Sequence, residues 1–253
     1  IILILHNNLH WFDYFENQIN IMREKYNFDF DFYIYENNSN IEFKERLKNF
    51  MVNSKGKFLS ETNKSTKFDS IISKERGIYM NDIRNKNKLN HGCLNSEYSW
   101  LVDSDVYFND DILVKYIDNL KNNSSLCAIS SLCLTKEVGL ENHNYDTLAF
   151  SNEKYNYVNT GNTCLMKNCI RCKNHRKNVN IFIPEKDLIV PGNIIYPNCA
   201  FNSNTLIHTE IYNKVKWTSE YGLEETDWFG FFRNLRYYGK IAMDTKIISY
   251  KCK

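Results

Sequence analysis

Two aspartates separated by a single residue follow an apolar run in the middle of the chain. Trp100, Leu101 and Val102 lead directly into Asp103 and Asp105. In an extended strand, residues i and i+2 project from the same face, so both carboxylates should point the same way where the strand ends. Carboxylate oxygens suit Mg²⁺ and Mn²⁺, and such ions commonly complete their shell with substrate phosphates. The spacing therefore predicts that Asp103 and Asp105 form a metal site for a diphosphate ligand.

The acidic residues that follow have a simpler interpretation. Asn109, Asp110 and Asp111 precede the segment Ile112–Leu120, whose apolar residues recur at helical spacing. Asparagine and aspartate commonly cap the start of a helix. Strand termination and helix capping explain these three side chains but leave Asp103 and Asp105 unexplained.

A second segment, Tyr221–Phe231, combines carboxylates with aromatic side chains. Glu224, Glu225 and Asp227 lie among tyrosine, tryptophan and phenylalanine residues. Carboxylates beside apolar aromatics can have raised pKa values and act as general bases. The alternative is a helix whose acidic first turn offsets the helix dipole. After a metal-type aspartate pair, the functional interpretation is favoured, with Asp227 and Glu225 ahead of Glu224 as candidate catalytic residues.

Hydrophobic periodicity predicts an α/β fold in the first half of the chain. Strands are expected at Ile1–Leu5, Phe28–Tyr35, Tyr98–Asp103 and Leu126–Ser131, with helices at Phe12–Tyr26, Phe43–Phe50, Ser73–Leu89 and Ile112–Leu120, and a polar loop at Asn53–Lys67. Strands alternating with helices predict a doubly wound, largely parallel sheet. Ligands bind such sheets beyond the carboxyl ends of the strands. We therefore expect His6–Asn8, Glu36–Asn40 and Asp103–Asp105 to converge on one edge.

Length and charge limit the possible functions. A chain of 253 residues can form one domain, with a regular half at 1–130 and a less regular, substrate-side half at 131–253. The net charge is +2 and the basic residues are dispersed, so nucleic acid is not an expected partner. No apolar run approaches the ~20 residues needed to span a bilayer. Any membrane anchor would lie outside this chain, which leaves a cytoplasmic or a lumenal location open.

The eight cysteines do not form a convincing disulfide framework. Cys164, Cys169, Cys172 and His175 are clustered, but a structural zinc site normally uses two paired halves. Reduced thiols are the favoured interpretation, ahead of a local disulfide or a zinc site.

Taken in order, these segments resemble nucleotide-diphospho-sugar glycosyltransferases of the GT-A fold. The resemblance is carried by Ile2–Asn8 and Tyr33–Ser39 as nucleotide-binding strands, Arg76 and the Ile-Arg-Asn triplet within Met80–Asn85, Trp100–Asp105 as the Asp-x-Asp motif, and Gly222–Trp228 as the acceptor-side acidic motif. It is close over the first half and looser over the second, where acceptor specificity lies.

The resemblance implies roles for individual residues on the donor side. Asp105 would ligate Mn²⁺ or Mg²⁺ directly, and Asp103 would contact the ribose or a metal-bound water. Glu36 would hydrogen-bond the base or ribose. His6 and Asn7 would line the floor of the nucleoside pocket. Arg76 and Arg84 would lie near the diphosphate, where cations offset its charge.

Members of this fold often take a further metal ligand, commonly histidine, from near the C-terminus. The corresponding segment here, Asp244–Cys252, contains no histidine. Asp244 and His208 are the candidate substitutes, and Lys251 could instead contact the diphosphate.

The implied function is metal-dependent, hexosyltransferase-type transfer from a nucleotide sugar to a hydroxyl of a glycan or glycoprotein acceptor. If the reaction inverts the anomeric centre, Glu224, Glu225 or Asp227 would take the acceptor proton. If it retains, the segment would bind the acceptor or support an ion-pair intermediate. Two alternatives remain. One is a haloacid-dehalogenase-type phosphatase with Asp103 as nucleophile and Asp105 as acid/base, although that family carries the motif after its first strand. The other is a non-catalytic carbohydrate- or nucleotide-binding relative.

Overall fold

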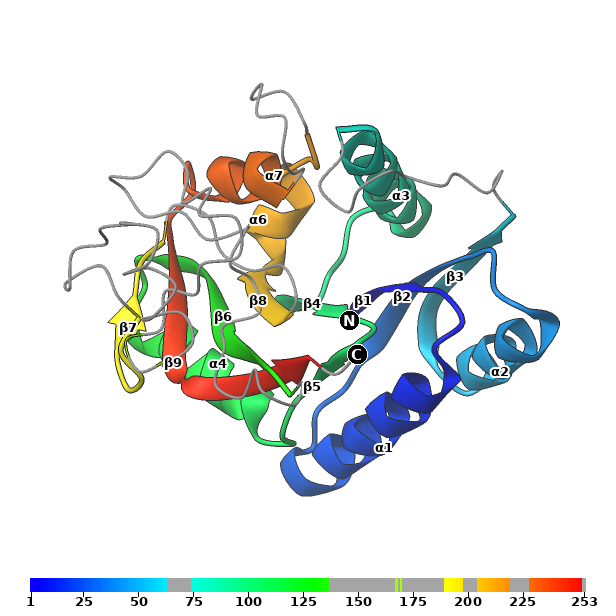
Figure 1. Ribbon diagram of the computed structural model, residues 1–253, viewed down its shortest axis with the longest axis horizontal. Helices are drawn as coiled ribbons and strands as arrows, with labels where there is room; N and C mark the ends of the chain where they lie inside the picture. The colour runs from blue at the N-terminus through cyan, green and yellow to red at the C-terminus, as the bar shows by residue number, and fades with distance from the viewer. Residues whose placement is uncertain are drawn as a thin grey trace.

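The computed structural model describes residues 1–62, 74–136, 167, 169, 189–197, 204–218 and 228–251. Figure 1 shows its helices and strands. In chain order they are β1 (Ile2–Leu5), α1 (Leu9–Tyr26), β2 (Asp31–Asn37), α2 (Ile41–Val52), β3 (Lys55–Glu61), α3 (Lys74–His91), β4 (Tyr98–Asp103), β5 (Val106–Tyr107), α4 (Ile112–Asn122), β6 (Leu126–Thr135), β7 (Ile194–Ile195), β8 (Asn204–His208), α6 (Thr209–Lys214), α7 (Trp228–Leu235) and β9 (Lys240–Lys251).

The described strands form one nine-stranded sheet. Its order is β3-β2-β1-β4-β8-β6-β9-β5, and β7 pairs with β9. Strands β3, β2, β1 and β4 are parallel, β8 is antiparallel to both β4 and β6, and β9 is parallel to β6. The predicted largely parallel α/β sheet is confirmed, and the carboxyl ends of β1, β2 and β4 meet at one edge.

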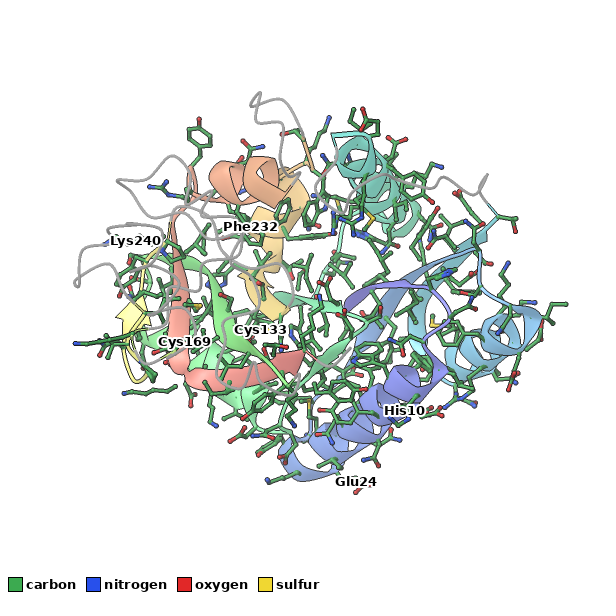
Figure 2. The ribbon with its side chains drawn as sticks, in the orientation of Figure 1. His10, Glu24, Cys133, Cys169, Phe232 and Lys240 are labelled. Carbon is green, nitrogen blue, oxygen red and sulfur yellow. The ribbon has the colours of Figure 1, made fainter. Side chains whose placement is uncertain are left out.

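Helices cover both faces of this sheet, as the alternation of the strand residues requires. Leu3 and Leu5 of β1 belong to a core that α1, α2 and α4 complete, whereas Ile2 belongs to a second core that includes α6 and α7. In Figure 1, α1, α2 and α4 lie below the sheet and α3, α6 and α7 above it. Helix α1 is amphipathic, with His10 and Glu24 exposed (Figure 2) opposite its buried aromatic side chains.

Helix α3 presents polar side chains to the sheet. Its buried residues recur every three or four positions and include Asn81, Arg84, Asn87 and His91. The Asn87 side-chain amide donates to the carbonyl oxygens of Leu3 (3.4 Å) and Tyr33 (3.3 Å) on β1 and β2. This stripe of polar side chains runs along the face of the sheet from its amino ends toward the edge where Asp103 lies.

One prediction was wrong: β3 lies inside the segment Asn53–Lys67, which was predicted to be a loop. β3 is an edge strand that pairs only with β2 among the described strands, and none of its residues is buried, so it lacks the hydrophobic alternation of a half-buried strand. Backbone pairing forms it instead. Gly56, at φ +122°, approaches β2 so closely that an added Cβ would lie 1.9 Å from the Phe32 carbonyl oxygen. The β6 strand also extends to Thr135, beyond the expected end at Ser131.

Candidate functional site

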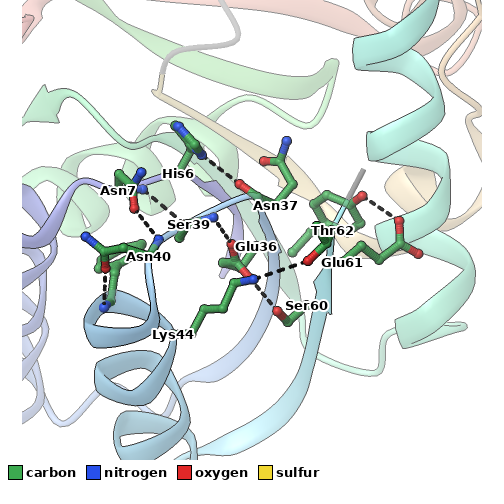
Figure 3. Close-up of polar contacts among 12 residues, drawn as sticks. His6, Asn7, Glu36, Asn37, Ser39, Asn40, Lys44, Ser60, Glu61 and Thr62 are labelled. Carbon is green, nitrogen blue, oxygen red and sulfur yellow. Dashed lines mark hydrogen bonds and ion pairs between the residues drawn. The ribbon is translucent and has the colours of Figure 1, made fainter. Parts of the chain in front are cut away.

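The turn after β1 is bonded to the turn after β2. Asn7 adopts a left-handed backbone conformation at φ 45°, and its N–H donates to Ser39 Oγ at 3.1 Å. Its side-chain oxygen accepts from the Asn40 N–H at 2.7 Å, and His6 Nδ1 lies 2.7 Å from the Asn37 carbonyl oxygen (Figure 3). His6 and Asn7 are both exposed. The two predicted nucleoside-binding side chains therefore lie on the surface of this double turn.

The same β1 turn is bonded to the turn between the two aspartates. The Asn8 side-chain amide donates to the Ser104 carbonyl oxygen, and its oxygen accepts from the Trp11 N–H at 3.3 Å, which caps α1. The Trp11 indole then donates to the Val106 carbonyl oxygen at 2.8 Å. The predicted convergence of three polar clusters on one edge is confirmed, and hydrogen bonds hold them together.

Among the described residues, Asp103 and Asp105 share a cationic partner, Lys251, at the end of β9. Lys251 Nζ lies 3.0 Å from Asp105 Oδ1 and 3.6 Å from Asp103 Oδ2. The lysine side chain is 9% exposed, whereas the aspartate side chains are 32% and 39% exposed. Burial raises the pKa of Asp105, the negative charge of Asp103 adds to that rise, and the Lys251 ammonium opposes it.

Strand β9 reaches the aspartates because it bends. Its pairing with β6 shifts register between Asp244 and Ile248, and the strand changes direction there (Figure 1). Thr245, in this bulge, donates its hydroxyl to the Asn193 carbonyl oxygen at 2.7 Å. Beyond the bend, Lys251 stands opposite Val106 of β5 and beside Thr135 of β6.

The chemistry of this pair fits a divalent cation held mainly by substrate. Oxygens of Asp103 and Asp105 flank a single position, now taken by an ammonium, and they are partly exposed. In the part of the chain that the structure describes, no group of three histidine, cysteine, aspartate or glutamate residues could hold a metal. Two carboxylates completed by phosphate oxygens and water match how Mg²⁺ is commonly bound.

Neither candidate substitute for the third ligand lies at this position. His208 pairs with Tyr98 at the amino end of β4, at the opposite end of that strand from Asp103. Asp244 is buried just before the bend, on the other side of it from Lys251, and it accepts from the Asn119 side-chain amide at 3.0 Å and from the Lys246 N–H at 2.9 Å. Neither His208 nor Asp244 is therefore placed to act as a third ligand beside Asp103 and Asp105.

Glu36 lies near the carboxyl end of β2, as predicted, one residue before the strand ends, but its carboxylate faces the protein. The side chain is fully buried; one oxygen accepts from the Ser39 N–H at 2.7 Å, and the other accepts from the Ser60 hydroxyl. Lys44 Nζ lies 3.8 Å from that second oxygen (Figure 3). These contacts hold the β2 turn, and the predicted hydrogen bond from Glu36 to a nucleoside would have to replace one of them.

The predicted diphosphate arginines lie on α3. Arg76 is half-buried near the start of the helix. Arg84 is buried, with its guanidinium 4.8 Å from the centre of the Trp217 ring, which stacks on Phe231 at 3.8 Å. Asn85 donates to the Trp217 carbonyl oxygen at 2.8 Å and accepts from the Trp217 N–H at 3.2 Å. Sequence reasoning missed this attachment of the Ile-Arg-Asn triplet to Trp217, because no local pattern links such distant segments.

Several predicted residues lie outside the described part of the chain. They are the candidate catalytic carboxylates Glu224, Glu225 and Asp227, and also Cys164, Cys172 and His175. Cys169 is described and is buried (Figure 2). Cys93 and Cys127 are free thiols. Within the described residues, no helix is both long and apolar enough to cross a membrane.

No protein-family model and no curated protein matches this sequence. Solved structures do match. The chain superposes on S. aureus TarS 1–349 with a TM-score of 0.53 at 12% identity, over 99% of this chain and 59% of that one. It superposes on GalNAc-T7, in a crystal structure with UDP, GalNAc and Mn²⁺, with a TM-score of 0.53 at 9% identity, over 100% of this chain and 43% of that one. Both neighbours are glycosyltransferases of the GT-A type.

The fold is of the GT-A type. At these identities the likeness shows the fold alone, and the chain spans about half the length of the two neighbours. The phosphatase alternative loses its basis, since it requires the aspartate pair after the first strand, whereas Asp103 ends β4.

Proposed function

We propose that this chain transfers a sugar from a nucleotide-diphosphate donor to a hydroxyl group of a glycan or glycoprotein acceptor. The observation that carries the proposal is the partly exposed Asp103–Asp105 pair at the carboxyl edge of a GT-A sheet, bonded through Asn8 to the β1 turn. Ligands of α/β sheets bind at this edge. An acidic pair there suits a ligand that arrives with a cation, which is how nucleotide sugars commonly bind.

The donor would lie across the turns that follow β1, β2 and β4. The exposed side chains of His6 and Asn7 would meet the nucleoside, and Asp103 would meet the ribose or a metal-bound water. Asp105 would ligate Mn²⁺ or Mg²⁺. A bound divalent cation would offset the charge that develops on the leaving diphosphate. Arg76 and Arg84 would add positive charge from α3. Arg84 would do so from its position beside the Trp217 ring.

The acceptor would bind over the second half of the chain. We assign the proton-accepting role to the segment with Glu224, Glu225 and Asp227. A general base must lie within hydrogen-bonding distance of the acceptor hydroxyl, so this assignment requires the segment to lie beside the bound acceptor. The attachment of Trp217 to Asn85 ties the chain just before that segment to the donor-side helix α3. This connection supports an active site that spans both halves.

The test has two steps. First, the melting temperature is measured with UDP, GDP and their sugar conjugates, each with and without Mn²⁺, because a ligand that binds the native state raises it by mass action. Second, the donor that stabilises most is incubated with a panel of glycan acceptors, and released nucleotide and product are quantified by mass spectrometry.

The outcomes separate the proposal from its rivals. A metal-enhanced shift with a nucleotide sugar, followed by transfer, supports the proposal. A shift with nucleotide but neither transfer nor hydrolysis across the panel supports a non-catalytic relative. The absence of any shift with every nucleotide, in a protein that melts cooperatively, would refute nucleotide-sugar binding.

A further inference from the structure

Lys251 holds the position that a cation between Asp103 and Asp105 would take. Its ammonium lies within 4 Å of an oxygen of each carboxylate, at 3.0 Å and 3.6 Å. The lysine approaches from the protein side, since it is nearly buried while both carboxylates are about one-third exposed. A divalent cation from solvent and this ammonium therefore compete for the same oxygens.

The backbone of Lys251 is fixed, so only its side chain can respond to a ligand. The residue is in register with Val106 on β5 and with Thr135 on β6. Its carbonyl oxygen also accepts from the Lys136 N–H at 3.1 Å. Lysine carries a compact charge on a flexible four-carbon chain, so the ammonium can exchange partners without movement of the sheet.

The charges determine how a metal and a diphosphate affect each other. Two carboxylates and one ammonium leave a single net negative charge, which attracts a divalent cation more weakly than the carboxylates alone. If the metal enters, the ammonium loses its contacts with the two carboxylates and faces a like charge nearby. A diphosphate removes this conflict because its oxygens can bind the metal and the ammonium together.

We propose that Lys251 couples cation binding to donor binding: it is the counter-ion of Asp103 and Asp105 in the free protein and a diphosphate ligand in the complex. The diphosphate part of this inference rests on the proposed function. Coupling of this kind is reciprocal, so metal must strengthen nucleotide binding by the same factor that nucleotide strengthens metal binding. The metal then arrives with the donor and is not a resident of the free protein.

Mn²⁺ binding to the full chain tests the proposal without any catalytic readout. Free Mn²⁺ is titrated by electron paramagnetic resonance with no nucleotide, with UDP and with GDP. For the wild type we expect weak binding alone and at least a tenfold gain with the accepted nucleotide. For Lys251→Met we expect Mn²⁺ alone to bind at least tenfold tighter, and the gain from nucleotide to shrink.

Two further variants keep the outcome interpretable. Lys251→Arg preserves the charge and should keep the coupling. Lys55→Met removes a lysine paired with Asp29 at 2.6 Å, at the start of β3, and should behave as the wild type. If Lys251→Met does not fold, the wild-type titrations still decide: Mn²⁺ that binds equally tightly with and without a bound nucleotide would overturn the proposal.

Failure of this inference differs from failure of the proposed function. Unchanged Mn²⁺ affinity in folded Lys251→Met, with nucleotide binding intact, overturns the role of Lys251 alone. Tighter Mn²⁺ binding in Lys251→Met without any nucleotide binding would support the competition between lysine and metal but refute the donor site and the coupling with it.

Discussion

Strands β2 and β4 flank β1, and both end in carboxylates at the same edge of the sheet, yet the two strand ends are used differently. Glu36 is fully buried and bonded to Ser39, Ser60 and Lys44. Asp103 and Asp105 are partly exposed, and their cationic partner is Lys251. Carboxylates at the same edge of the sheet therefore differ in their surroundings. Exposure and the kind of partner distinguish the two.

The difference has a local cause. After Glu36 the chain turns through Asn38 at φ 56°, which brings the Ser39 N–H back to the carboxylate that needs it. After Asp103 the turn is held by Asn8, whose amide bonds to the Ser104 carbonyl oxygen. One turn is held by its own acidic side chain, and the other is held by Asn8 from the turn that follows β1. The aspartate side chains consequently stay 32% and 39% exposed.

The largest expected effect is on activity at the β4 end. Asp105→Asn should lower metal-dependent transfer about a thousandfold, or ~4 kcal/mol, because an amide is a poor ligand for a hard cation and carries no charge. Its melting temperature should stay close to that of the wild type, since the side chain is 39% exposed. Initial rates at saturating donor, together with thermal melts, give the measurement.

A nearby aspartate supplies the matched control. Asp110 is 27% exposed and pairs with Lys25 at 2.8 Å, so Asp110→Asn removes a similar charge and a similar ion pair. This variant should transfer sugar at close to the wild-type rate. Equal losses in both variants would mean that Asp105 acts only through general charge or folding, and the contrast between the strand ends would fail.

The next effect is on stability at the β2 end. Glu36→Ala leaves the Ser39 N–H, the Ser60 hydroxyl and Lys44 without their acceptor, and should cost about 3 kcal/mol of unfolding free energy. That corresponds to a fall of about 6–12 °C in melting temperature for a chain of this size. Glu45→Ala, at an exposed position on α2, should cost little. A weakened donor affinity in Glu36→Ala with an unchanged melting temperature would assign Glu36 to the nucleoside pocket instead.

The sequence predicted one strand end better than the other. For Asp103 and Asp105, the apolar run and the two acidic residues lie within a few positions, so the strand and the partly exposed carboxylates at its end follow from local pattern. The extended i, i+2 spacing does not hold, because Ser104 and Asp105 lie in a turn. The partners of Glu36 are not local: Ser60 belongs to β3, an edge strand whose exposed residues resemble a loop. Lys251 reaches Asp105 only through the bend in β9, which a bulge produces and no periodicity signals.

The pH dependence of the melting temperature tests a buried histidine at the opposite end of the sheet from the carboxylates. His91 is buried at the end of α3, its ring centre 5.0 Å from that of Tyr33, and burial lowers the pKa of His91 to about 4. The unfolded chain takes up this proton below about pH 6.5. Between pH 6.5 and 4 the unfolded state binds the proton and the folded state does not, so stability falls as pH falls.

We therefore expect the melting temperature to drop by several degrees from pH 7 to pH 4.5, and His91→Gln to reduce that slope. His10→Gln, at an exposed position on α1, should follow the wild type. An identical slope in His91→Gln and wild type would mean that His91 is not the source of the acid sensitivity.

The smallest effect isolates a single hydrogen bond of the β2 end. Ser60→Ala removes the hydroxyl that donates to Glu36 but leaves the Ser39 N–H and Lys44 in place. Loss of one such bond to a charged group that keeps other partners should cost about 1 kcal/mol, or 2–4 °C in melting temperature. Donor affinity should not change, because Ser60 holds the inner side of a carboxylate that faces the protein. A donor affinity that falls together with stability in Ser60→Ala would mean that the β2 turn positions the donor through Glu36, and the two strand ends would then serve one site.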